Sequence, residues 1–221
     1  MRSVGNILRA APRMLVPVVR AYERRLSRYG PTAQGVFWKN QEWQVRRYAI
    51  LEDIFDDMAQ AGGITIHDFG CGYGAFFDYL MDHPAMQASL YIGTDMCGSM
   101  LEAAQHRIND PRASFNHGFS AEVEADYTFV SGTFNMSLDA NNAFWDQYVR
   151  STLLELWKHT RHGFAFNLLN VSTDEKHTGL YYAKPEDYVE FAQTHMDPEA
   201  VLIVEAPLPD FTILTKRRVP L

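Results

Sequence analysis

The chain has 221 residues, of which 47% are hydrophobic and 21% charged, and its formal net charge is −7. This size and composition are typical of a soluble protein with one sizeable α/β domain and its own core. The two cysteines, Cys71 and Cys97, exclude a disulfide framework and favour a reducing, cytoplasmic location. No apolar run in the sequence is long enough to span a membrane as a helix.

Charge is divided unevenly along the chain. Residues 1–30 hold seven arginines and one acid, Glu23, whereas the rest of the chain sums to −13. An acidic body argues against a nucleic-acid partner, because phosphate backbones need a basic face. We expect the basic arm to be a helix, about 18–29, that packs on the domain, since Pro12 and Pro17 interrupt the pattern before it. A membrane-surface or targeting role, or docking of a partner or second copy, are the alternatives.

A turn-rich segment, 30–40, follows this helix and contains Trp38. A second amphipathic helix is predicted over about 41–59, with Trp43 and Arg47 near its start. Trp38, Trp43 and Arg47 are candidates to line a substrate pocket formed by the N-terminal extension. They are equally consistent with aromatic packing residues and a surface cation.

A glycine-rich turn dominates the next stretch. Residues 64–69 read as a short buried strand that includes Asp68 near its end, and 75–81 read as the first turns of a helix. Gly70, Gly72 and Gly74 lie between them, where positive φ and free backbone N–H groups suit a bound ligand. The loop fits two patterns: G-x-G-x-x-A, typical of dinucleotide sites, and acidic-x-G-x-G-x-G. A tight turn without a ligand is the third possibility.

Strands and helices then alternate. Strands are predicted at 88–94, 113–117, 126–132 and 163–169, and helices at 100–108, 142–160 and 185–195. This alternation indicates a parallel sheet with helices on both faces. The last two strands, 201–206 and 211–215, are joined by too few residues for a helical crossover, so they should pair antiparallel.

Five helix-linked strands with a C-terminal hairpin resemble the class I methyltransferases that use S-adenosylmethionine. The resemblance covers about residues 64–216 and rests on the loop at 68–74, the acidic strand end at 91–95, and the strand at 126–132. Segments around Trp38, 131–135 and 209–214 resemble a small bacterial subgroup. The resemblance to class I methyltransferases implies an α/β fold with a single doubly wound, mostly parallel seven-stranded sheet. Residues 61–221 would be the cofactor-binding domain, and 1–60 a helical extension that acts as a lid.

The resemblance also implies which residues hold the cofactor. Asp68 would stabilise the ammonium of its methionine half, where Gly70, Cys71 and Gly72 let the backbone approach. Asp95, at the end of the second strand, would accept both ribose hydroxyls, and it is also suited to cap the following helix.

The adenine side departs from the family pattern. Met96 would cover one adenine face, but the acid often found after the third strand is missing. Packing by Phe119, Ser120 or a backbone carbonyl would have to take its place. Ser131 follows the fourth strand, where the resemblance places the reacting sulfonium.

The sequence gives weaker signals for the residues that would contact the methyl acceptor. Asn135 is a candidate to orient the acceptor, although asparagine is also common in turns. His177, Tyr181 and Tyr182 lie in the loop after the fifth strand, a natural lid, and His177 is a candidate general base. No cysteine and histidine spacing predicts a metal site.

We therefore expect a methyltransferase that moves a methyl group to an N, O or C nucleophile of a small molecule. A non-catalytic partner subunit that docks through the basic arm, and a protein or peptide methyltransferase, are the alternative functions.

Overall fold

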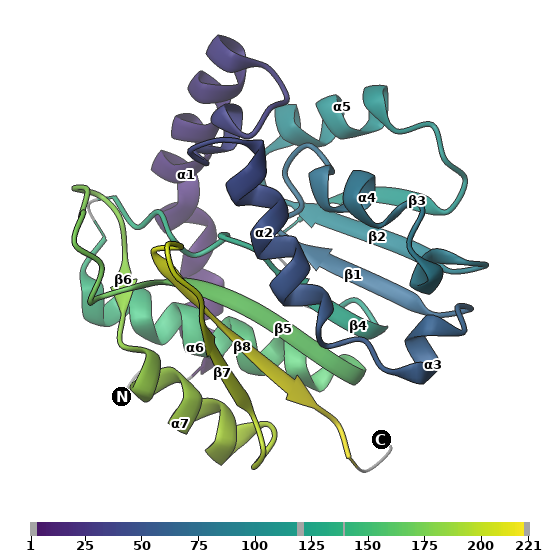
Figure 1. Cartoon of the computed structure of the whole chain (residues 1–221). Coiled ribbons are helices and arrows are strands. Elements are labelled where there is room, and N and C mark those ends of the chain that lie inside the picture. The colour runs from purple at the N-terminus through teal and green to yellow at the C-terminus, as the bar shows by residue number, and fades with distance from the viewer. Residues whose placement is uncertain (1–3, 119–121, 139, 219–221) are drawn as a thin grey trace.

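A computed structural model describes residues 4–118, 122–138 and 140–218 (Figure 1). One sheet runs through it in the order β3-β2-β1-β4-β5-β8-β7. Its strands are β1 (Thr65–Phe69), β2 (Leu90–Asp95), β3 (Ala113–His117), β4 (Ala125–Val130), β5 (Thr160–Asn170), β7 (Val201–Val204) and β8 (Asp210–Lys216). The strands from β3 to β5 are parallel, and β8 runs antiparallel to both β5 and β7. The predicted mostly parallel sheet with a C-terminal antiparallel hairpin is confirmed, and a two-residue strand, β6 (Tyr182–Ala183), adds to β5.

Helices cover both faces of the sheet, as expected for a doubly wound fold. They are α1 (Val4–Tyr29), α2 (Gln41–Glu52), α3 (Asp57–Gln60), α4 (Ala75–Leu80), α5 (Gly98–Arg107), α6 (Asn142–Lys158) and α7 (Pro185–His195), with short 3₁₀ turns η1 (Gln34–Val36) and η2 (Pro84–Met86). One core joins α1, α6 and α7 to one face, around Trp145 and Phe166. The other joins α2, α3 and α4 to the opposite face, around Leu51 and Phe129.

The N-terminal helix is longer than predicted. It begins at Val4 rather than near residue 18, and Pro12 and Pro17 lie inside it. Each proline removes one backbone hydrogen bond. Ala11, Leu15 and Val18 are buried against α6 and the sheet, so tertiary packing outweighs this local loss.

The predicted second helix over 41–59 is in fact two helices, because Asp56 starts a new one. The Asp56 carboxylate accepts hydrogen bonds from the backbone N–H groups of Met58 and Ala59, at 3.1 and 3.2 Å. It also accepts one from the Tyr127 hydroxyl at 2.7 Å, which fixes the break against β4. The described residues between β3 and β4 form no helix.

Helix α1 crosses the carboxyl edge of the sheet. The arrowheads of β1 and β2 point toward it in Figure 1, and it contacts α6 and α5. Its residues Val19, Tyr22 and Leu26 pack on Cys97 and Met100 at the start of α5. The edge where parallel α/β sheets bind ligands is therefore roofed by the N-terminal helix.

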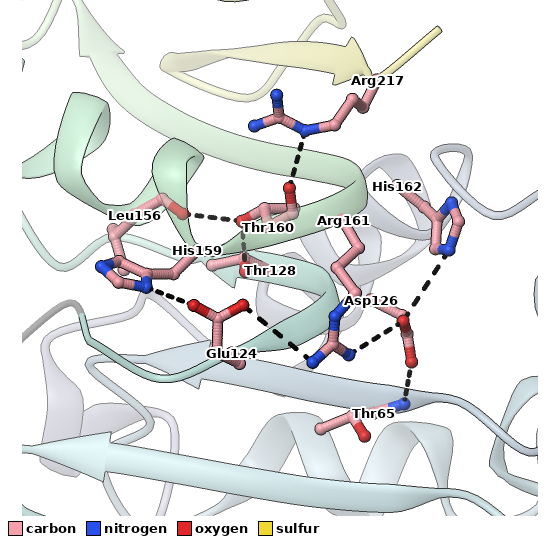
Figure 2. Close-up of polar contacts among 10 residues, drawn as sticks. All are labelled: Thr65, Glu124, Asp126, Thr128, Leu156, His159, Thr160, Arg161, His162 and Arg217. Carbon is pink, nitrogen blue, oxygen red and sulfur yellow. Dashed lines mark hydrogen bonds and ion pairs between the residues drawn. The ribbon is translucent and has the colours of Figure 1, made fainter. Parts of the chain in front are cut away.

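The amino edge of the sheet is held by a separate polar network (Figure 2). The Asp126 carboxylate accepts from the backbone N–H of Thr65 at 2.7 Å, which joins β4 to β1. The hydroxyl of Thr160 lies 2.7 Å from that of Thr128 and donates to a carbonyl of α6 at 2.8 Å. Arg217 donates to the Thr160 carbonyl at 2.9 Å. These bonds lie at the end of the sheet away from α1, so they hold the scaffold.

Candidate active site

A cavity of about 640 Å³ lies at the carboxyl ends of β1, β2, β4 and β5. This volume is within the range of small-molecule sites. Its roof comes from α1 and the segment 36–48, and its floor from the glycine loop and the ends of the strands. Residues 173–182 and the turn before β8 complete the rim.

The glycine loop adopts the conformation that its composition predicts. Gly70, Gly72 and Gly74 have φ values of 81°, 54° and 81°. A Cβ on Gly70 would lie 2.3 Å from the Thr133 hydroxyl oxygen, and one on Gly74 would lie 2.5 Å from Ile108 Cδ1. The first and third glycines therefore permit close packing. Gly72 has only a Val36 methyl at 3.6 Å near its would-be Cβ, and it lines the cavity.

Asp95 combines the two roles that the sequence left open. One carboxylate oxygen accepts from the backbone N–H of Gly72 at 2.8 Å, and the other accepts from that of Cys97 at the start of α5, also at 2.8 Å. The side chain also lines the cavity. Burial raises its pKa against the opposing effect of these hydrogen bonds. A carboxylate has about four lone-pair positions, so each oxygen can still accept a ligand hydroxyl.

Asp68 is buried beside the loop and lines the same cavity. It accepts a hydrogen bond from the Tyr91 hydroxyl at 2.5 Å. Burial raises the pKa of this carboxyl to about 7, and no cation among the described residues forms an ion pair with it. A ligand ammonium at this position would supply the missing positive charge.

Three other predicted cofactor residues line the cavity: Cys71, Met96 and Ser131. The Ser131 hydroxyl is buried and has no hydrogen-bond partner among the described residues. A buried hydroxyl without a partner costs about 1–3 kcal/mol, so this atom favours a ligand that provides one. Phe119 lies outside the described residues.

The cavity's other end is built around Arg47, which is 2% exposed and is thus not a surface cation. Its Nε donates to the carboxylate of Asp210, and its Nη1 donates to the Trp43 carbonyl at 2.7 Å. Its guanidinium carbon lies 4.2 Å from the centre of the Trp38 ring. Arg47, Trp38 and Trp43 all line the cavity, so the structure brings these predicted substrate residues together.

Asn135 lies next to this group. Its side-chain oxygen accepts from the backbone N–H of Leu169 at 3.3 Å, and the residue is buried in the cavity wall. A Cβ on Gly132 would lie 2.4 Å from the Trp38 ring and 3.5 Å from the Asn135 amide nitrogen. Gly132, whose φ is 70°, therefore lets the Trp38 ring pack closely on the end of β4, near Asn135.

The predicted lid residues divide between two environments. Tyr182 lines the cavity, and its hydroxyl accepts from the backbone N–H of His177 at 2.8 Å. The His177 side chain is 64% exposed at the rim, and its ring lies 3.5 Å from the Glu175 carboxylate. Tyr181 is absent from the cavity wall, is 7% exposed, and donates to Asp146 at 2.6 Å. Neighbouring residues of an extended segment point to opposite sides, so a substrate contact by Tyr181 is not supported.

Sequence reasoning missed two residues of the cavity wall, Tyr22 and Gln44, and one residue behind it, Asp210. Tyr22 of α1 lines the wall, and burial together with the charge of Asp95 raises the pKa of its phenol. Gln44 also lines the cavity; it is buried and accepts from the Tyr73 hydroxyl at 3.1 Å. Asp210, the first residue of β8, holds Arg47, and an acid directly before the predicted strand 211–215 was the available signal.

In the part of the chain that the structure describes, no group of three or more histidine, cysteine, aspartate or glutamate side chains is arranged to hold a metal ion. Within residues 4–118, 122–138 and 140–218, no helix combines the length and apolar character needed to cross a membrane.

Comparison with known proteins identifies the family. No protein-family model matches the chain. A Mycobacterium tuberculosis protein named "Putative methyltransferase Rv1506c" is 34% identical over 161 residues, which are 71% of this chain and 95% of that protein. The chain belongs to this methyltransferase family.

Solved structures share the fold of this methyltransferase. Magnesium protoporphyrin IX methyltransferase from Synechocystis with bound SAH matches with a TM-score of 0.59 and 11% identity, over 79% of this chain and 84% of that one. Human N-acetylserotonin methyltransferase in complex with SAM matches with a TM-score of 0.63 and 14% identity, over 92% of this chain and 59% of that one. The "putative S-adenosylmethionine dependent methyltransferase" from Listeria monocytogenes matches with a TM-score of 0.55 and 13% identity, over 78% of this chain and 98% of that one. The class I methyltransferase fold expected from the sequence is confirmed.

Proposed function

We propose that this methyltransferase transfers the methyl group of S-adenosylmethionine to an N, O or C nucleophile of a small-molecule acceptor. The observation that carries the proposal is the Asp95 carboxylate, held by the Gly72 and Cys97 backbone and facing the cavity. One structural relative contains bound SAH and another is in complex with SAM, which supports the same cofactor here.

The described residues fit this cofactor at four points. Asp95 would accept the two ribose hydroxyls, and Asp68, which has no cation of its own, would hold the ammonium group. The Ser131 hydroxyl, which is otherwise without a partner, would gain one from the ligand. Gly72 leaves the approach to the loop open, since no side chain occupies that space.

When bound, the cofactor supplies an electrophilic methyl group on a sulfonium. The protein's contribution is then to align the acceptor and exclude water, because methyl transfer in line needs little more. Helix α1 and the segment 36–48 roof the cavity, and Tyr182 closes the rim. His177 is exposed and paired with Glu175, so we assign it no direct role as a base in this conformation.

The roof also favours a small acceptor over a protein. Leu15, Val18 and Tyr22 of α1 line the cavity together with Trp38 and Trp43, so the acceptor end is enclosed by side chains. A folded protein substrate would need this roof to move away. An acceptor scan that compares small aromatic and aliphatic compounds with peptides separates these two substrate classes.

We also propose that the exposed face of the basic arm docks an acidic partner or a second copy of the chain, which was an alternative to the expected role of a helix that only packs on the domain. Arg13, Arg20, Arg24 and Arg28 are exposed on α1, and none of them makes an ion pair within the described residues. Sedimentation of the protein at low and high salt tests self-association, which should weaken as salt screens these charges.

Cofactor binding tests the proposed function directly. We expect S-adenosylhomocysteine to bind the protein in a calorimetric titration, and Asp95→Ala to weaken it by at least about thirtyfold, because two charge-assisted hydrogen bonds are lost. Asp95→Asn is the milder variant: its side-chain oxygen can still accept a hydrogen bond from the backbone, so a loss of binding in this variant is not explained by misfolding of the loop. Asp126→Asn is the matched control, since Asp126 also accepts a backbone N–H but lies at the amino edge. Unchanged affinity in Asp95→Asn, or no binding to the parent protein, would refute the proposal.

A further inference from the structure

The acceptor end of the cavity presents hydrogen-bond donors that the protein does not use. The Arg47 guanidinium has five N–H donors in a planar fork. Its Nε is bonded to Asp210 and its Nη1 to the Trp43 carbonyl, whereas its Nη2 makes no hydrogen bond with a described residue. Because Arg47 lines the cavity, this nitrogen is the part of the group left for a ligand.

Asn135 offers a second donor whose orientation is fixed. Its oxygen accepts from the Leu169 backbone, which sets the amide so that Nδ2 is the remaining atom. This nitrogen has no acceptor among the described residues, and it lies beside Gly132, where the Trp38 ring also packs. The Trp38 ring is in turn covered by Arg47, at 4.2 Å. The two donors therefore belong to one wall of the cavity, although they come from α2 and the loop after β4.

Acceptor groups are scarce at this wall. Asp210 is not a lining residue: one of its oxygens is bonded to Arg47, and the other is buried beneath the surface. Two acidic residues of the rim, Asp174 and Glu175, also line the cavity, and both are exposed, Glu175 with 83% of its side chain. Lys39 adds positive charge at the same end, since its ammonium lies 4.2 Å from the Trp43 ring and the residue lines the cavity.

We propose that the acceptor is a planar aromatic carboxylate whose charged group faces Arg47 Nη2 and Asn135 Nδ2. This inference rests on the proposed methyl transfer for its use of the site, but recognition of the carboxylate can be measured alone. Two unpaired N–H donors require lone pairs from the ligand, and a carboxylate presents only lone pairs. An amine would instead bring donors to donors and a positive charge to Arg47 and Lys39. Trp38, Trp43 and Tyr182 supply the flat walls that suit an aromatic ring.

The experiment compares two probes on one scaffold, 2-naphthoate and 2-naphthylmethylamine, by calorimetric titration at pH 7.5 with S-adenosylhomocysteine present. We expect 2-naphthoate to bind at least tenfold more tightly. Arg47→Lys keeps a cation beside Asp210 but loses the fork, so it should weaken 2-naphthoate by about tenfold or more. Asn135→Asp keeps the acceptor for the Leu169 N–H but replaces the donor with an anionic oxygen. It should weaken 2-naphthoate and strengthen the amine.

Asn141→Asp is the matched control. Asn141 caps α6 by accepting from the backbone N–H groups of Ala143 and Phe144, and it does not line the cavity. The same change in charge there should leave the ratio of the two affinities unaltered.

The proposal is overturned if the amine binds the parent protein as tightly as 2-naphthoate, or if Asn135→Asp leaves that ratio unchanged. It is also overturned if a protein that binds S-adenosylhomocysteine shows no measurable binding of 2-naphthoate. Failure of S-adenosylhomocysteine to bind refutes the cofactor assignment instead. The two probes are then compared without it.

Discussion

The buried Arg47–Asp210 pair should be a major determinant of stability. Both side chains are 3% exposed, and the pair joins α2 to β8 across 163 residues of sequence. We consider Arg47→Met, Asp210→Asn and the double variant. Methionine matches the arginine stem in length and can still pack on Trp38, so its main effect is to remove the charge.

The size of the effect follows from what each variant leaves behind. Arg47→Met leaves a buried carboxylate with no cation, and breaking a buried pair in this way costs about 3–5 kcal/mol. Burial already raises the pKa of Asp210 against the effect of Arg47, so the unpaired carboxyl should take up a proton and recover part of this loss. In the double variant the carboxylate is gone as well. Its loss should therefore be smaller than the sum of the single losses, by roughly 1–3 kcal/mol.

Urea unfolding at pH 7 measures these losses, with a common slope across the variants to show that the unfolded state is unchanged. In thermal unfolding, a loss of about 3–5 kcal/mol corresponds to a fall in Tm of roughly 6–20 °C at this chain length. A loss below about 1 kcal/mol in Arg47→Met, or additivity within about 0.5 kcal/mol, would refute the reasoning. Either result would mean that the two charges do not depend on each other.

Three further predictions concern the loop and the scaffold. The pKa of Asp68 is about 7 in the fold but about 3.9 in an unfolded chain, so the folded state binds a proton more tightly. The stability that this proton contributes is therefore fully present below pH 4 and is lost as the pH rises through 7. The loss amounts to at most about 4 kcal/mol in the free energy of unfolding. Asp68→Asn should remove this pH dependence from urea midpoints measured without cofactor. Gly74→Ala should cost roughly 1–3 kcal/mol in the same assay, because φ is 81° and the new Cβ meets Ile108; a neutral result would contradict the loop geometry. Arg217→Ala should lower the free energy of unfolding by about 1–3 kcal/mol, because its hydrogen bonds to the Thr160 and Trp157 carbonyls are lost. It should leave the affinity for S-adenosylhomocysteine unchanged. A lower affinity would mean that the amino edge of the sheet belongs to the binding site.

Elements with strong local signals were predictable from sequence. The strand at Ala113–His117 and the helix at Pro185–His195 have the predicted bounds, and in the helix Pro185 occupies the first turn. The glycine loop has positive φ at each of its three glycines, as a strand followed at once by a helix requires. These features depend on a few adjacent residues, so the sequence pattern is sufficient to place them.

Elements controlled by distant contacts were not predictable in the same way. The break between α2 and α3 depends on the Tyr127 hydroxyl, which β4 brings to Asp56 from 71 residues away. The full length of α1 depends on burial of Ala11 and Leu15 against α6, which compensates for Pro12 and Pro17 inside the helix. Propensity and spacing carry no information about such partners, so the sequence predicted the type of these elements but not their bounds.

The candidate site divides along the same line. Its proposed cofactor end includes Asp68, Gly72 and Asp95, which lie on β1, the loop and β2, and the resemblance of these motifs to a known family was enough to bring them together. Tyr181 and Tyr182 show the limit, because only the structure reveals which of two adjacent tyrosines faces the cavity.

The proposed acceptor end is built from residues that lie far apart in the sequence. Trp38 and Arg47 come from the N-terminal extension, Asn135 from the loop after β4, and Asp210 from the C-terminal hairpin. None of them belongs to the β1–loop–β2 unit that holds Asp95. Substitutions at Arg47 or Asn135 can therefore change the acceptor's polar contacts without moving the backbone that would bind the cofactor. The physical separation of the two halves explains how this fold can keep one cofactor site while the acceptor varies.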